Sequence, residues 1–227
     1  MSWKLEPLHL ADVTYPDDHP RAGETAPVYA YALVGSRGYV LVDTGIGPEH
    51  PAVDERYQPQ RRSLSDALAH VGCISQPDAI VLTHLHFDHC GGAPAFAGVP
   101  LYVQENEREA AREPGYSIPE RVDYPGANYV LLRGRQEVVD GVRVIPTPGH
   151  TPGHQSVAVD TEQGEVILAG QAAEHLAAWE TFMSGDHAEF SGEELGSLDR
   201  LAAMGDTTAM YFSHDHRPWL KGSADAA

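Results

Sequence analysis

The 227-residue sequence contains little cysteine and no long apolar run. Cys73 and Cys90 are its only cysteines, and they fit free or buried thiols better than a disulfide. No stretch approaches the roughly 20 apolar residues that span a bilayer. The first residues also lack the basic patch and apolar core of a signal peptide. We therefore expect a cytoplasmic protein with no membrane partner.

Basic residues are also scarce. The chain has 15 Lys and Arg against 33 Asp and Glu, which gives a formal net charge of −18. Such a field repels phosphate backbones, so we expect no nucleic-acid partner. A neutral small molecule needs no electrostatic steering and remains compatible with this surface as a substrate. The composition does not predict the oligomeric state.

Length and patterning predict one α/β domain over residues 1–227, because no linker or low-complexity tract divides the chain. Alternating apolar residues predict strands at 28–34 and 39–42, joined as a hairpin. Ser63 can cap a helix over 63–71, and Ser191 with Glu194 forms a capping-box pattern for a helix ending near residue 204. The charged segment 104–112 predicts an exposed helix, and Asp140-Gly141 predicts a hairpin turn.

Three segments rich in Pro, Gly or aromatic residues are predicted to be loops that shape a pocket: 14–26, 113–128 and 174–190. Their aromatic side chains either pack on the core or line an apolar cleft, and the sequence leaves both alternatives open. The large apolar residues concerned are Tyr116, Tyr124, Trp179, Phe182, Met183 and Phe190.

Four groups able to bind a metal follow the apolar run at 79–82: His84, His86, Asp88 and His89. This mixture of ligands suits zinc or another first-row divalent ion. Alternate residues of an extended segment share a face, so His84 and His86 are placed to bind one ion. Asp88 and His89 lie where the chain turns, and they are placed to bind a second ion about 3.5–4 Å away.

Two later predicted strands also end in histidine. The strand at 142–145 runs into Pro146-Thr147-Pro148-Gly149-His150, and the strand at 210–213 runs into His214-Asp215-His216. Prolines and glycines around His150 fix an irregular backbone, which indicates that His150 is a functional residue. Histidines therefore follow three predicted strands, those that end near residues 82, 145 and 213.

These motifs resemble the metallo-β-lactamase superfamily, whose signature is His-x-His-x-Asp-His followed by two more histidines. Leu41-Val42-Asp43-Thr44-Gly45 is similar to the family's aspartate motif, in which Asp43 orients a ligand histidine from outside. Asp43 also fits a simple turn cap. The resemblance implies a four-layer αββα sandwich with the metals at one edge. The runs around His150 and His214 look most similar to N-acyl homoserine lactone hydrolases.

The resemblance also implies the ligands. His84, His86 and His150 match the first metal's ligands, and Asp88, His89 and His214 match the second's. We accordingly expect one or two zinc ions. His154 and His216 follow ligand candidates closely and are interpreted as outer residues that do not touch the metal, or as loop residues.

Position 171 departs from the family pattern, because Gln171 stands where an aspartate normally bridges both ions. A neutral amide offers one good acceptor oxygen, so the second ion should bind more weakly. Glu174 is either a substitute ligand or a residue of a solvated loop. Lactonases of this type often carry a tyrosine about where Glu174 stands, and this chain does not.

We therefore expect a metal-dependent hydrolase that opens a lactone or related ester by attack of a metal-bound hydroxide. Asp88 would guide the proton to the leaving alkoxide. The alternatives are a hydrolase of another ester, thioester or amide in a specialised biosynthetic pathway, and a non-catalytic scaffold that only binds a ligand.

Overall fold

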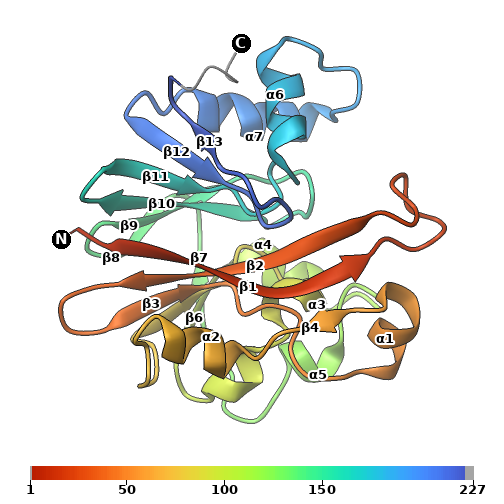
Figure 1. Cartoon of the computed structure of the whole chain (residues 1–227), viewed down its shortest axis with the longest axis vertical. Helices are drawn as coiled ribbons and strands as arrows, with labels where there is room; N and C mark the ends of the chain where they lie inside the picture. Colours follow the sequence, from red (N-terminus) through yellow and green to blue (C-terminus); the bar gives the residue numbers. More distant parts are fainter. Residues whose placement is uncertain (1, 223–227) are drawn as a thin grey trace.

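The computed structural model describes residues 2–222 and consists of two sheets that face one another, with helices on their outer sides (Figure 1). The first sheet is formed, in spatial order, by β4 (Gln60–Arg61), β1 (Lys4–Thr14), β2 (Thr25–Val34), β3 (Tyr39–Val42), β5 (Ala79–Val81), β6 (Pro100–Gln104) and β7 (Asn128–Leu132). The second is formed by β13 (Trp219–Leu220), β12 (Thr207–Tyr211), β11 (Gly164–Leu168), β10 (Gln155–Thr161), β9 (Val142–Pro146) and β8 (Gln136–Val139).

Helices cover both outer faces. Those beside the first sheet are α1 (Pro51–Tyr57), α2 (Leu64–His70), α3 (Phe87–Cys90), the 3₁₀ turn Ala93–Phe96, α4 (Glu105–Ala110) and α5 (Pro119–Val122). Those beside the second are α6 (Leu176–Met183) and α7 (Gly192–Ala202). The layers therefore follow the αββα order that the sequence predicted. No helix within residues 2–222 is long and apolar enough to cross a membrane.

The alternation of side chains in the inner strands explains the layers. In β3, Val40 and Val42 pack between the two sheets, whereas Tyr39 and Leu41 pack under the helices of the first sheet. In β11, Leu168 faces the space between the sheets and Ile167 packs against α6 and α7. Strands covered on both faces need apolar residues at every position, which is why these segments read as unbroken apolar runs.

Parallel pairing places the site at one end of the sandwich. β3 pairs with β5, and β5 with β6, in parallel, while β11 pairs in parallel with β12. The carboxyl ends of parallel strands meet at the same sheet edge. The segments that follow β5, β11 and β12 therefore start from that edge.

Several predicted elements are confirmed with small shifts in their ends. The Ser63 cap of α2 accepts from the Asp66 amide, and α7 has the complete capping box of Ser191 and Glu194.

Three expectations were wrong. The segment 174–190 contains α6, whose Leu176, Trp179 and Phe182 are buried, and 113–128 contains α5. The helix at 104–112 is not simply exposed, because Glu107 within α4 is completely buried.

Candidate metal centre

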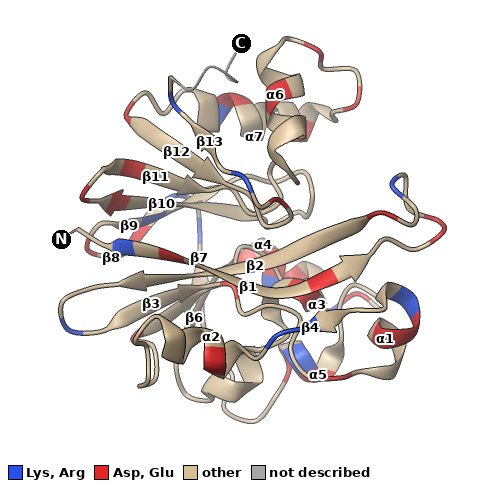
Figure 2. Cartoon of the chain, viewed as in Figure 1, with Lys and Arg blue, Asp and Glu red and all other residues tan. Residues whose placement is uncertain are grey.

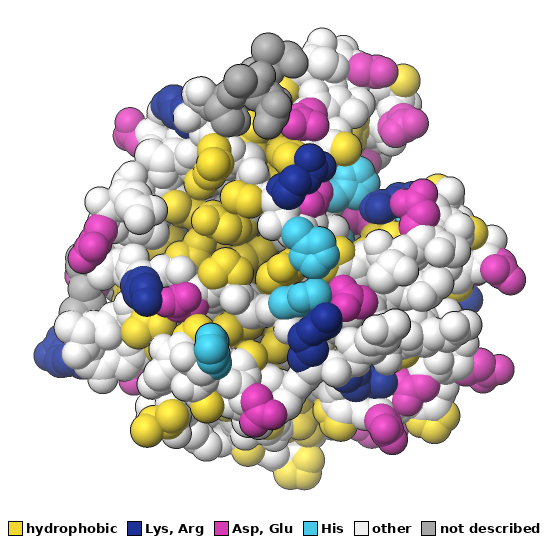
Figure 3. Space-filling view, viewed as in Figure 1, with side chains coloured by type: hydrophobic (Ala, Val, Ile, Leu, Met, Phe, Trp, Pro, Cys, Tyr) yellow, Lys and Arg dark blue, Asp and Glu magenta, His cyan; other side chains and the backbone are white. Residues whose placement is uncertain are grey.

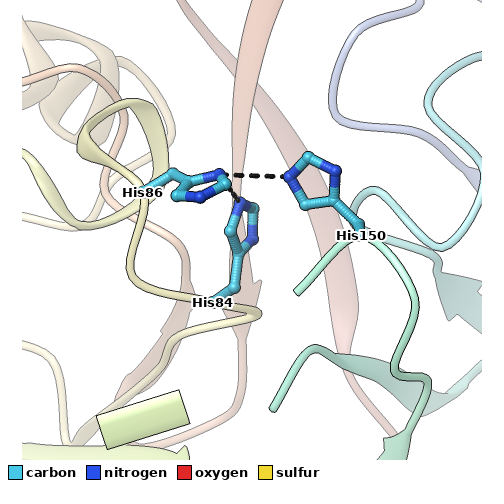
Figure 4. A group of neighbouring side chains, drawn as sticks. All are labelled: His84, His86 and His150. Carbon is cyan, nitrogen blue, oxygen red and sulfur yellow. Dashed lines mark hydrogen bonds between the residues drawn. The ribbon is translucent and has the colours of Figure 1, made fainter. Parts of the chain in front are cut away.

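Three histidines from two distant segments converge beyond β5 and β9 (Figure 4). Nε2 of His84 lies 3.2 Å from Nδ1 of His86, which in turn lies 3.1 Å from Nε2 of His150. Burial is the first cause that lowers the pKa of each of these imidazoles, and for His84 and His150 neighbouring histidines lower it further. Neutral imidazoles with converging nitrogen atoms are the form that binds a metal cation.

A carboxylate and two further histidines form a second group. Oδ2 of Asp88 lies 3.4 Å from Nε2 of His89 and 3.4 Å from Nε2 of His214. Burial alone would raise the pKa of Asp88, but His89 and His214 hold it well below its usual range. Burial favours neutral His89, yet the carboxylates of Asp88 and Asp43 outweigh it and raise its pKa to about 10. His89 is therefore protonated between two ionised carboxylates at neutral pH, and it would have to lose this proton to bind a cation.

The outer nitrogens of these two histidines are already occupied. Nδ1 of His89 lies 2.8 Å from Oδ2 of Asp43, and Nδ1 of His214 lies 2.8 Å from the Pro27 carbonyl oxygen. Nε2 of His89 is buried without a hydrogen-bond partner. Each ring is thus held by its Nδ1 while its Nε2 points toward Asp88, which is the usual arrangement of a metal-ligating histidine and its supporting acceptor.

Asp43 contacts a candidate ligand, as its motif suggested, but the partners of its carboxylate are Thr83 and His89 and not the amides of the turn that follows it. Its carboxylate accepts from the backbone N–H and the hydroxyl of Thr83, at 2.8 Å each, and contacts His89. It is buried and has a φ of 58°, a conformation that non-glycine residues rarely adopt. The strained backbone places one carboxylate between the end of β5 and α3.

The donor set fits a divalent first-row metal. His84, His86 and His150 present nitrogens that lie within 4.8 Å of one another, and so do the ligand atoms of Asp88, His89 and His214. Mixed imidazole and carboxylate donors of this kind suit zinc. The structure brings together all six side chains that the sequence singled out, and their role as ligands stays a prediction.

Gln171 contacts His154, whose ring lies 5.3 Å from that of His84. Its Oε1 is buried without a hydrogen-bond partner, and its backbone N–H donates to Nε2 of His154 at 3.0 Å. A Cβ on the preceding Gly170 would lie 2.6 Å from that nitrogen, so glycine is needed there. A buried oxygen that accepts no hydrogen bond lowers the stability of the fold unless a donor or a cation binds to it. Gln171 therefore has an amide oxygen available for a cation.

His154 and His216 lie outside both groups. Nδ1 of His154 donates to the Thr147 carbonyl oxygen at 3.0 Å, while its Nε2 accepts from Gln171, so neither nitrogen is available. His216 is hydrogen-bonded to the Tyr29 hydroxyl at 2.9 Å and packs edge-on against His9. Figure 3 shows exposed histidine side chains beside a hydrophobic area where the two sheets meet.

Glu174 belongs to neither group. The Tyr15 hydroxyl donates to its carboxylate, and Nη1 of Arg21 lies 3.9 Å from the same oxygen. Burial and the charges of Glu174 and Asp88 raise the pKa of Tyr15, so this phenol stays protonated. The substitute-ligand alternative thus finds no support in the geometry. Sequence reasoning missed Tyr15, because a tyrosine in a Pro- and Asp-rich loop carries no signal for a contact 159 residues away.

The aromatic residues of these segments pack on the core, which is the first of the two alternatives. Trp179 and Phe182 are buried in the core beneath α7. Tyr116 also packs against the core, and its ring lies 4.9 Å from the ring of His86, next to the candidate metal centre. A separate cavity of about 910 Å³ opens beside α2 and the Gly91-Gly92 turn, and none of the six candidate ligands lines it.

Known proteins are similar to this chain in sequence and in fold. The family model described as Metallo-beta-lactamase superfamily matches residues 23–214. An N-acyl homoserine lactonase of a Bacillus species is 35% identical over 209 residues, covering 83% of this chain and 81% of the relative. The lactonase AiiA of Bacillus thuringiensis subsp. kurstaki is 34% identical over 212 residues, covering 83% of this chain and 81% of the relative.

Solved structures agree with the sequence relatives. An N-acyl homoserine lactone hydrolase with the product N-hexanoyl-L-homoserine bound at its catalytic metal centre superimposes with a TM-score of 0.78 and 30% identity. The match covers 95% of each chain. The superfamily and the sandwich that the motifs predicted are therefore confirmed, and the relatives support a hydrolase. This chain belongs to the metallo-β-lactamase superfamily.

Proposed function

We propose that this chain is a metal-dependent hydrolase that opens N-acyl homoserine lactones or closely related cyclic esters. The observation that carries the proposal is the convergence of six candidate ligands in two adjoining groups. Curated relatives named as lactonases, at 34–35% identity over most of the chain, support the substrate class. We further propose zinc as the metal, a single domain over residues 1–227, and a cytoplasmic location.

In this proposal His84, His86 and His150 hold one ion, and Asp88, His89 and His214 hold the other. A bound divalent ion lowers the pKa of water and polarises a carbonyl oxygen. Asp43 fixes the ring of His89 through the 2.8 Å contact to Nδ1. The oxygen of Gln171 adds a neutral donor where a bridging carboxylate would add a charge, so the proposed ions are held with unequal affinity.

Asp88 is the proposed proton carrier. Its side chain is 13% exposed, and its Oδ2 lies 3.4 Å from Nε2 of both His89 and His214. The carboxylate accepts the proton that the attacking nucleophile releases and passes it to the alkoxide that leaves when the ring opens. The net reaction adds one water to the ester bond and yields a hydroxy acid.

The surface suits a neutral substrate. The arginines near α1 and β4 are matched by carboxylates: Arg56 pairs with Asp18 at 2.9 Å, and Arg62 with Asp12 at 2.8 Å. In Figure 2 the Asp and Glu positions, coloured red, are spread over all layers of the ribbon. An anionic polymer would be repelled by this field, whereas a lactone carries no charge. Phe87 and Tyr116 are apolar groups adjoining the candidate ligands, placed to contact an acyl tail.

The test is a substrate panel with the zinc-loaded protein. Ring opening releases acid, so a pH-indicator assay follows it directly. We expect N-acyl homoserine lactones of several chain lengths to be opened in preference to thioesters and β-lactams. A chelated sample and the His150→Ala variant serve as controls, and both should lose activity.

The second candidate is a hydrolase of another ester, thioester or amide. The observation that favours it is the pairing of Glu174 with Tyr15, which gives this rim of the site a carboxylate in place of the tyrosine often seen in lactonases. Activity confined to thioesters or β-lactams would establish this alternative. A zinc-loaded protein that is inactive on every substrate class would instead indicate a ligand-binding scaffold.

A further inference from the structure

Glu107 is a completely buried carboxylate that lies close to the three-histidine group without belonging to it. It lies on α4, whose neighbouring Glu105 instead pairs with Arg133 at the surface. Ionised carboxylates are seldom fully buried unless they are paired or hydrogen-bonded. No cation within residues 2–222 forms an ion pair with Glu107, so hydrogen bonds alone must satisfy it.

Four donors satisfy the two oxygens of Glu107. Oε1 accepts from the Leu85 N–H at 2.8 Å and from the Tyr116 hydroxyl. Oε2 accepts from the Thr151 hydroxyl at 2.7 Å and from the Gly153 N–H at 3.2 Å. A carboxylate is the side chain that accepts at four positions and donates at none.

Three of the four donors belong to the segments that carry the three histidines, and the fourth is Tyr116. Leu85 lies between His84 and His86 in the sequence, and Thr151 follows His150 directly. The ring of Tyr116 lies 4.9 Å from that of His86. A Cβ at Gly153 would lie 2.1 Å from the Glu107 backbone nitrogen, so the His150 segment is packed tightly against α4.

Charge gives a second reason for this placement. His84, His86 and His150 are all neutral ligand candidates, whereas the other group contains Asp88 and is supported by Asp43. The hydrogen bonds to Leu85 and Thr151 place the Glu107 carboxylate beside the three-histidine group, whose own side chains supply no negative charge.

We propose that Glu107 is the positioning residue of the three-histidine site: it joins the His84–His86 loop to the His150 loop and supplies the negative charge that their ion would otherwise lack. The proposal rests on the proposed metal centre and not on the identity of the substrate. It assigns to Glu107 the part that Asp43 takes for His89. Groups that support metal ligands from outside typically contribute 10–100-fold to metal affinity.

The test measures zinc affinity of the full chain by competition with a chromophoric chelator, after the metal has been stripped. His214→Ala impairs the second group, so the remaining tight site reports His84, His86 and His150. In this background Glu107→Gln should weaken zinc binding by about 10–100-fold. In the His150→Ala background the same substitution should leave the remaining affinity unchanged. Glu105→Gln, on the same helix, is the matched control and should change neither affinity.

The outcomes separate this inference from the proposed function. Equal weakening in both backgrounds, or no weakening in either, would overturn the role of Glu107. Weakening confined to the His214→Ala background supports it even if no lactone is hydrolysed, because zinc affinity does not depend on the substrate. If Glu107→Gln does not fold, Thr151→Val removes one donor at nearly constant volume. It should weaken the same site to a smaller extent, and an unchanged affinity would contradict the proposal.

Discussion

Oδ2 of Asp43 lies 2.8 Å from Nδ1 of His89, and the same carboxylate accepts from the Thr83 N–H at 2.8 Å. One buried side chain thereby joins the end of β3, the end of β5 and the ligand helix α3. The ring of His89 can rotate only by breaking this contact. The orientation of its unpartnered Nε2 is therefore set from outside the candidate metal centre.

Asp43→Asn should weaken the site of Asp88, His89 and His214. An amide either presents a donor to His89 or loses one bond to Thr83, so the ring of His89 is held less firmly. We expect zinc affinity at this site to fall by about 10–100-fold, measured by chelator competition. Asp206→Asn, at an exposed position, is the control. An unchanged affinity in Asp43→Asn would contradict the supporting role.

His150 and His154 should behave differently although they are four residues apart. His150→Ala removes a candidate ligand, so most bound metal and nearly all hydrolysis should be lost while the fold survives. His154→Ala leaves the Gln171 N–H and the Thr147 carbonyl oxygen without their partner. It should lower the free energy of unfolding by about 1–3 kcal/mol while metal content is retained. Elemental analysis and denaturant unfolding of both variants check this; the reverse pattern would refute the assignment.

Gln171→Asp should tighten the second ion. The buried Oε1 of Gln171 has no partner, and an anion in its place would offset the charge of two dications. After mild dialysis, elemental analysis should give nearer one zinc than two per chain for the parent and nearer two for the variant. Unchanged metal content in Gln171→Asp would show that this side chain does not face the ions.

Glu174→Gln is the companion variant. Because Glu174 accepts from Tyr15 and contacts neither ligand group, its replacement should leave the zinc content as it is. Loss of one ion on this substitution would make Glu174 a ligand after all.

Both thiols should be unreactive in the folded protein. Burial raises the pKa of Cys90 to about 12 and also raises the pKa of Cys73. A raised thiol pKa means that the neutral, weakly nucleophilic form prevails at pH 8. A colorimetric thiol reagent should react slowly at pH 8 in buffer and with two equivalents after denaturation. Rapid reaction of the native protein would contradict the buried, free state of these cysteines.

The convergence of the six candidate side chains could be predicted from the sequence because their positions depend on local patterns. His84, His86, Asp88 and His89 follow one apolar strand within six residues, and His150 and His214 each follow another. Strand ends gather at a sheet edge whatever the details of packing. Asp43 was found in the same way, as a polar residue directly after a buried strand.

The supporting residues could not be predicted, because their roles depend on contacts between distant segments. Glu107 looked like part of a charged, exposed helix, and only the approach of Leu85 and Thr151 buries it. Tyr15 meets Glu174 only once the β1–β2 turn has folded beside α6. The apolar stripe of Leu176, Trp179 and Phe182 did carry a helical period, which the aromatic-rich composition of 174–190 obscured.

The most direct test of the metal centre is anomalous X-ray diffraction from crystals of the full chain grown with zinc, recorded at the zinc absorption edge. The account predicts a strong peak about 2.0–2.1 Å from nitrogen atoms of His84, His86 and His150, and a weaker peak beside Asp88, His89 and His214. A folded protein without a peak between His84, His86 and His150 would contradict the account.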